Sequence, residues 1–188
     1  NLKGIDAESV SLRLRDGEQR DPAYAAVNPQ CLVPTLVLDD GTALTQSQAI
    51  IEYLDEAHPE PPLLPREARA RAWVRAVAQT IACDIHPLNN LRVLQYLERD
   101  LGQAPEAVKA WYAHWVRLGF DALERQLADP PLSGRFCCGD APGLADIFLV
   151  PQVRNARRYQ LDLAAYPRIV AIDAACAELD AFRRASPE

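Results

Sequence analysis

Residues 28–54 carry the pattern that decides the fold, and they read NPQCLVPTLVLDDGTALTQSQAIIEYL. The segments 35–38 and 42–44 are rich in β-prone side chains, and the Asp39-Asp40-Gly41 between them is typical of a hairpin turn. From Ser47 onward the apolar residues recur at helical spacing. The stretch therefore predicts two antiparallel strands followed directly by an amphipathic helix.

The residues before this stretch predict one more strand and one short helix. Residues 8–14 alternate polar and apolar side chains, which is typical of a strand with Val10, Leu12 and Leu14 on one face. Asp21-Pro22 is typical of a helix start and predicts a helix to about residue 27. The order strand, helix, hairpin, helix indicates a small α/β domain.

A proline-rich linker, HPEPPLLP at residues 58–65, separates this domain from a helical remainder. We expect an α/β domain over residues 1–63 and an all-helical domain over residues 66–188. Helices are predicted over 66–100 with a kink at Pro87, from Pro105, over 143–159 and over 167–184, with a loop at 129–142. The tryptophans (Trp73, Trp111, Trp115) are expected in the core, and the helix from Pro105 is expected to bury Val108, Trp111, Trp115, Leu118 and Ala122.

The composition excludes several classes of function. The chain has 188 residues, a formal net charge of −6 and 20 scattered basic residues, which disfavours nucleic-acid binding. No apolar run approaches the ~20 residues that a membrane-spanning helix needs. Five cysteines without a Cys-x-x-Cys motif indicate neither a zinc site nor a redox pair. These features predict a cytoplasmic protein without a metal site.

Two short motifs are candidate ligand contacts. A cis bond at Val33-Pro34 would leave the Val33 backbone free to pair with an extended peptide, although Pro34-Thr35-Leu36 alone favours a plain proline that starts a strand. Gln46-Ser47 lies at a predicted helix start, where free amides attract a carboxylate. Ser47 could instead simply cap that helix.

Together, residues 28–54 resemble the thioredoxin-like N-terminal domain of glutathione transferases, without a gap. The helical remainder resembles the second domain of that family. The resemblance implies that Val33 pairs with the cysteinyl backbone of glutathione and that Gln46 and Ser47 hold its γ-glutamyl carboxylate. It also implies a glutathione contact at Gln30.

Residues 84–94, DIHPLNNLRVL, and 150–159, VPQVRNARRY, look like the zeta class of that family. This class contains glutathione-dependent maleylacetoacetate and maleylpyruvate isomerases of aromatic catabolism. The resemblance implies glutathione contacts at His86 and Asn90 and substrate contacts at Arg92 and Arg158. From spacing alone, Arg158 with its two neighbouring arginines also fits a solvated helix face, and His86 fits an ordinary helix-end histidine.

The chemistry that the resemblance implies suits these residue types. The thiolate of glutathione adds to a cis enone, the new single bond rotates, and the thiol is then eliminated unchanged. Arginines suit the substrate because it is a dianion. We therefore expect a homodimeric maleylacetoacetate isomerase with glutathione as cofactor.

Three alternatives remain: a maleylpyruvate isomerase, a conjugating or dehalogenating transferase that consumes glutathione, and a non-enzymatic binding module. The family's Ser-Ser or Ser-Cys catalytic motif and first strand are expected before Asn1. The thioredoxin-like domain is accordingly expected to be incomplete, and no catalytic residue is predicted within residues 1–188.

Overall fold

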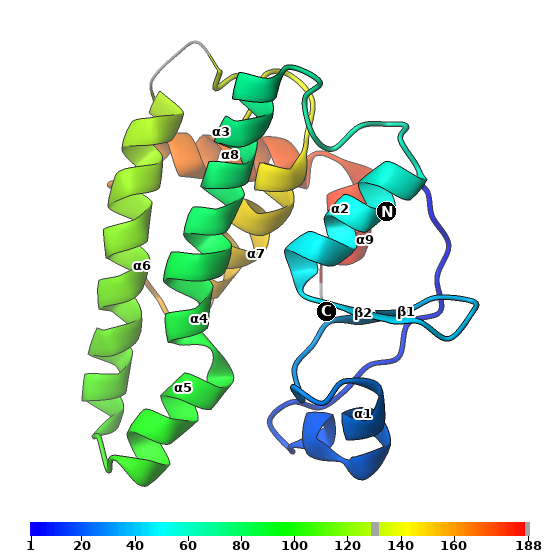
Figure 1. Ribbon diagram of the computed structural model, residues 1–188. Helices are drawn as coiled ribbons and strands as arrows, with labels where there is room; N and C mark the ends of the chain where they lie inside the picture. Colours follow the sequence, from blue (N-terminus) through cyan, green and yellow to red (C-terminus); the bar gives the residue numbers. More distant parts are fainter. Residues whose placement is uncertain (129–131, 187–188) are drawn as a thin grey trace. The chain divides into compact units, whose positions relative to one another are not determined.

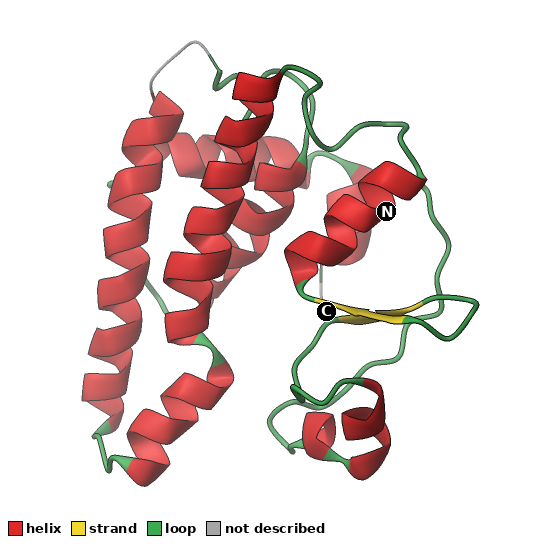
Figure 2. Cartoon of the chain, viewed as in Figure 1, coloured by secondary structure: helices red, strands yellow, loops and turns green. Residues whose placement is uncertain are grey.

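The computed structural model describes residues 1–128 and 132–186, and it divides into two compact units, Asn1–Pro61 and Pro62–Glu188. The first three residues of the loop predicted at 129–142 lie outside the described residues. Within the described part, strands occur only in the first unit, and the second is built from helices (Figure 2). The prediction of an α/β region followed by an all-helical region is confirmed.

The first unit contains the predicted hairpin and the helices on either side of it (Figure 1). Its elements are η1 (Glu18–Arg20), α1 (Pro22–Val27), β1 (Thr35–Val37), β2 (Ala43–Thr45) and α2 (Ser47–Ala57). The two strands are antiparallel, with Thr35 opposite Thr45. Gly41 takes a φ of 85° in the connecting turn, a conformation that glycine adopts without steric cost.

The prediction of a strand at residues 8–14 is wrong. These residues form no helix or strand, and the side chain of Val10 is 80% exposed. An alternating pattern forms a strand only where another strand supplies hydrogen bonds, and in the described residues β1 and β2 pair only with each other. The Arg13 N–H donates instead to the Glu18 carboxylate at 2.7 Å.

The second unit contains the four predicted helical regions, with more breaks than the sequence indicates. Its elements are α3 (Ala68–Gln79), the π-helix η2 (Thr80–Ile85), α4 (His86–Asn89), α5 (Leu91–Gln95), the π-helix η3 (Tyr96–Asp100), α6 (Pro105–Ala128), α7 (Leu144–Arg158), α8 (Pro167–Ala177) and α9 (Asp180–Ala185). At Pro87, where a kink was predicted, the chain changes from the π-helical turn η2 to the α-helical turn α4. The π-helical turns, the break at Asn90 and the break after Ala177 were not predicted.

The core of the second unit lies where α3 packs on α7, α7 on α8, and α6 on η2 and α8. Its largest fully buried side chains are Phe120, Phe136, Ile85, Leu123, Leu127, Leu144, Leu149, Ile169, Ile172, Val74, Val77 and Val116. Each such side chain contributes about 1.5–3 kcal/mol when removed from water. No helix in the described ranges is long and apolar enough to cross a membrane.

The buried stripe predicted for α6 is also wrong. The buried residues of α6 are Tyr112, Val116, Phe120, Leu123 and Leu127, whereas Leu118 is 55% exposed. The three tryptophans are half-buried rather than core residues. Helix α6 carries apolar residues on two faces, so the spacing shows the period but not which face packs against the other helices.

Asp146, in the first turn of α7, caps the start of that helix. Asp146 is 1% exposed, and its two carboxylate oxygens accept the N–H groups of Gly143 and Cys137, each at 2.8 Å. Burial raises the pKa of Asp146, and these two hydrogen bonds act in the opposite direction. Asp146 therefore joins the loop before α7 to the first turn of that helix.

Candidate functional site

A hydrogen-bond network shapes the loop between α1 and β1. Asn28 is 1% exposed, and its Nδ2 donates to the Leu32 carbonyl at 2.7 Å and to Thr35 Oγ1 at 3.1 Å. Its Oδ1 accepts the Gln30 N–H at 3.0 Å. The Tyr24 hydroxyl donates to the same Leu32 carbonyl at 2.6 Å. These bonds fix the course of the chain from Gln30 to the start of β1.

Val33 lies within this loop and presents its backbone. Its peptide bond to Pro34 is cis, as the sequence suggested, and the residue is 44% exposed. Among the described residues, the Val33 N–H and C=O have no hydrogen-bond partner. A free N–H and C=O beside a strand are what an extended peptide needs for pairing.

Gln30 and Gln46 come together although they are 16 residues apart, because Gln46 Nε2 donates to Gln30 Oε1 at 3.2 Å. Gln46 is the N-cap residue of α2 and takes a φ of 72°, in the left-handed region. No side chain caps this helix. Ser47 is its first helical residue, and the Ser47 hydroxyl has no partner in the described part of the chain.

Capping therefore does not explain Ser47. The first N–H groups of an α-helix have no intrahelical acceptor, and they carry the positive end of the helix dipole. An uncapped start with a free hydroxyl suits a carboxylate ligand. Of the predicted contacts in the first unit, the structure thus joins Gln30 to Gln46 and puts Ser47 next to them in the chain.

His86 and Asn90 form a second group, on α4 and at the start of α5. His86 Nε2 lies 3.5 Å from Asn90 Nδ2, and Asn90 Oδ1 accepts the Arg92 N–H at 3.2 Å, capping α5. Desolvation by the surrounding protein lowers the pKa of His86, although its side chain is exposed. A neutral imidazole with one free nitrogen lone pair can accept a hydrogen bond from an amide.

The arginines at the end of α7 differ in their partners. Arg157 Nη1 lies 2.5 Å from Asp173 Oδ2, and Arg154 Nη1 donates to Ser186 Oγ at 2.9 Å. In contrast, the guanidinium of Arg158 has no hydrogen bond or ion pair with any described residue. The same holds for the guanidinium of Arg92 on α5. Both arginines that the sequence singles out thus have a guanidinium available to an anion.

Two aromatic rings that were not predicted lie near Arg158. Tyr112 stacks on Tyr159 with ring centroids 3.6 Å apart. Burial raises the pKa of Tyr112 to about 12, with the positive charge of Arg158 acting in the opposite direction. Tyr112 therefore stays a neutral phenol beside the Arg158 charge. Its position on α6, far from Arg158 in the chain, gave no local signal.

Comparison with known proteins identifies the family. Residues 1–57 match the model of the glutathione S-transferase N-terminal domain, and residues 116–184 match that of the C-terminal domain. The chain is 52% identical to the maleylpyruvate isomerase of Ralstonia sp. over 188 residues, covering 100% of this chain and 88% of the relative. This chain belongs to the glutathione S-transferase family.

Solved structures assign the class within this family. A maleylpyruvate isomerase described as a bacterial zeta-class glutathione S-transferase superposes with a TM-score of 0.95 at 51% identity, covering 99% of this chain and 87% of that one. A maleylacetoacetate isomerase from Methylobacterium extorquens, with bound malonate and glutathione, also gives 0.95, at 42% identity, covering 98% and 86%. The predicted transferase fold and zeta class are confirmed.

Proposed function

We propose that this protein is a glutathione-dependent isomerase that converts maleylacetoacetate to fumarylacetoacetate in the catabolism of aromatic compounds. The observation that carries the proposal is the similarity, along the whole chain, to isomerases acting on maleylpyruvate and maleylacetoacetate. Maleylpyruvate is the alternative substrate, favoured by the higher identity of the Ralstonia relative.

Glutathione is the proposed cofactor, bound in the domain of residues 1–63. It is an extended peptide with a carboxylate at each end, and the described residues fit it. The unpaired Val33 backbone suits its peptide group, while Ser47 and Gln46 at the uncapped start of α2 suit its γ-glutamyl carboxylate. Gln30 is proposed as a further contact, held in place by the Gln46 amide.

In the domain of residues 66–188, we assign two roles. His86 and Asn90 are proposed to contact glutathione, with the neutral imidazole as hydrogen-bond acceptor or donor. Arg92 and Arg158 are proposed to bind the carboxylates of the substrate. Bound glutathione supplies a thiolate that adds reversibly to the substrate double bond.

The arginines act by holding charge and position. A guanidinium can donate two parallel hydrogen bonds to one carboxylate, which fixes the end of a dicarboxylate while leaving its middle carbons free to turn. Arg158 supports this role because it has no partner among the described residues, whereas Arg157 is engaged with Asp173. The malonate bound by the Methylobacterium relative is itself a small dicarboxylate.

The test is the conversion of maleylacetoacetate by the purified protein with and without glutathione. We expect rapid isomerisation only when glutathione is present, and a lower kcat/KM for maleylpyruvate. Equal background rates with and without glutathione would contradict the proposal. A higher kcat/KM for maleylpyruvate would assign the protein to the alternative substrate.

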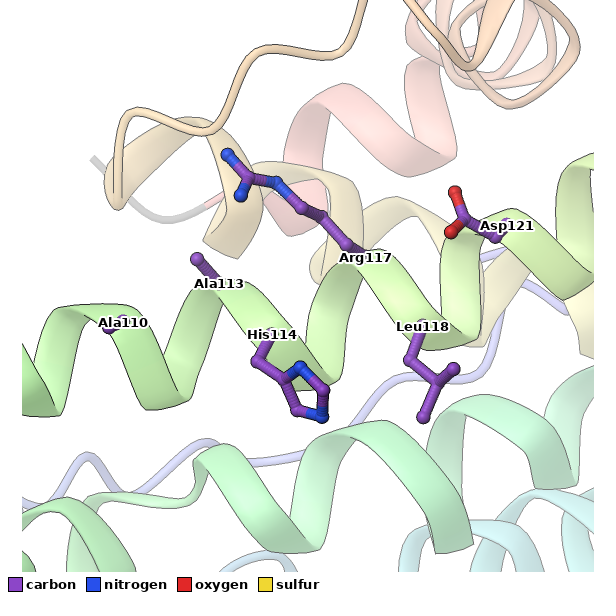
Figure 3. A pocket seen from close by; sticks show the side chains of 6 residues that line it. All are labelled: Ala110, Ala113, His114, Arg117, Leu118 and Asp121. Atoms are coloured by element: carbon purple, nitrogen blue, oxygen red, sulfur yellow. The ribbon is translucent and has the colours of Figure 1, made fainter.

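We also propose a homodimer, supported by an exposed face of α6. Six side chains of this helix line a hollow of ≈ 360 Å³ (Figure 3): Ala110, Ala113, His114, Arg117, Leu118 and Asp121. Leu118 is 55% exposed, so this face offers apolar surface that a second copy of the chain would cover. Leu118→Arg should convert a dimer into a monomer in light scattering; an unchanged mass would contradict this interface.

The proposed location is the cytoplasm. All five cysteines are free thiols in the structure, which suits a reducing compartment that also supplies glutathione. Fractionation of cells that express the protein would test this location, and recovery outside the cytoplasm would contradict it.

A further inference from the structure

The short segment that carries His86 and Asn90 needs contacts from other elements to fix its conformation. Helix α4 has four residues, and it lies between the π-helix η2 and Asn90, whose ψ is 147°. Pro87 has no backbone N–H, and the His86 N–H bonds to Ile81, five residues back. A single helical turn is unstable in isolation, so contacts from elsewhere in the unit must fix its position.

Helix α6 supplies two such contacts. Trp111 Nε1 donates to the Leu88 carbonyl at 2.8 Å, and Asn89 Nδ2 donates to the Tyr112 carbonyl at 3.3 Å. Trp111 and Tyr112 are adjacent on a helix of 24 residues, which is anchored in the core by fully buried side chains such as Phe120. These two hydrogen bonds attach α4 to a long helix whose own position is fixed.

The neighbouring Trp115 makes no equivalent bond. Its ring lies edge-on to that of Trp111, with centroids 5.6 Å apart. Its Nε1 is buried and has no hydrogen-bond partner among the described residues. The two indoles therefore share a helix and a local environment, but only one donates to the segment that carries His86 and Asn90.

We propose that Trp111 is a positioning residue for glutathione binding, because its indole N–H holds the Leu88 carbonyl and so keeps His86 and Asn90 in place. This inference rests on the proposed role of those two residues. Without the bond, α4 spends part of its time in other positions. The apparent affinity for glutathione then falls in proportion to the fraction of molecules in which α4 keeps its binding position. The steps that follow binding are unchanged.

Trp111→Phe and Trp115→Phe form a matched pair, since each keeps an aromatic ring and removes one N–H. For Trp111→Phe we expect the KM for glutathione to rise about three- to tenfold, with kcat within about twofold of wild type. Amide hydrogen exchange of residues 86–92 should become faster in the same variant. For Trp115→Phe we expect KM and kcat within about twofold of wild type.

An unchanged KM in Trp111→Phe, or an equal rise in Trp115→Phe, would overturn the inference. Asn89→Ala removes the second bond to α6 and should also raise KM; if Trp111→Phe does not fold, an unchanged KM in Asn89→Ala overturns it. His86→Ala separates the two proposals. An unchanged KM there refutes the role of His86, whereas a raised KM there with a normal Trp111→Phe refutes only the role of Trp111.

Discussion

Replacing Arg158 by glutamine should separate substrate binding from folding. Arg158 is exposed and has no hydrogen bond or ion pair within the described residues, so its removal leaves no protein group unpaired. We expect the free energy of unfolding to change by less than about 0.5 kcal/mol. A hydrogen bond to a charged group contributes about 1.5–3 kcal/mol. Loss of one such bond to the substrate carboxylate corresponds to a decrease in kcat/KM of about 10- to 150-fold.

Arg157→Gln is the matched control, one residue away on the same turn of α7. Arg157 pairs with Asp173. The side chain of Arg157 is 51% exposed and that of Asp173 is 10% exposed. Because the arginine is half in solvent, breaking the pair should cost only about 1–2 kcal/mol of stability. We expect kcat/KM within about twofold of wild type.

The assays are urea unfolding and isomerisation kinetics on both variants. We expect opposite patterns: Arg158→Gln loses activity and keeps its stability, whereas Arg157→Gln loses stability and keeps its activity. A stable Arg158→Gln variant with wild-type kcat/KM would refute the role of Arg158. An equal loss of activity in both variants would indicate a general effect of charge rather than binding by Arg158.

Three further predictions follow from the same structure. Ser47→Ala should raise the KM for glutathione about tenfold without loss of stability in urea, since Ser47 caps nothing; an unchanged KM would contradict its carboxylate role. Asp146→Ala should cost about 2–4 kcal/mol in urea unfolding, because a buried N–H (Cys137) and a partly buried N–H (Gly143) lose their acceptor. The exposed Asp140→Ala should cost under about 1 kcal/mol, and equal losses would contradict the capping role. The pKa of His86 is lowered in the folded protein, so its stabilising contribution is present above the unfolded pKa of about 6.5 and is lost as the pH falls through the folded pKa. His86→Gln should therefore lose less stability than wild type between about pH 7.5 and 5.5. Parallel curves of stability against pH would contradict this.

Local patterns predicted the elements that depend on local chemistry. The hairpin around Gly41 and the helices that begin at Pro22, Ser47 and Pro105 follow from turn residues, capping positions and hydrophobic spacing, and all are present. The candidate contacts Gln46 and Ser47 were predictable for the same reason, because they lie at a helix start. The hydrogen bond from Gln46 to Gln30 was not predicted, and the family resemblance implied only that Gln30 contacts glutathione.

The failures concern interactions between residues distant in the chain. The alternation around Val10 indicates a strand only if a partner strand exists, and none of the described strands pairs with it. The exposure of Leu118 depends on which apolar face of α6 meets the other helices. The Asn28-Pro29 pair favours a turn, but the buried network of Asn28 with Tyr24 has no sequence signal.

The hydrogen bond from Trp111 to Leu88 has the same character. It spans 23 residues and joins a side chain to a backbone carbonyl that is free because the helix breaks at Asn90, where the Arg92 N–H bonds to the Asn90 side chain instead. Hydrophobic periodicity assigns a tryptophan to the core and does not show what its N–H meets.

The central claim is that glutathione is a cofactor that returns unchanged, and the most direct test measures the product and the remaining glutathione in one sample. Fumarylacetoacetate formed and free thiol remaining would be measured together, with maleylacetoacetate in large excess over glutathione. We expect many molecules of product for each glutathione and a constant concentration of thiol. One thiol lost for each substrate consumed would contradict it and indicate a conjugating transferase.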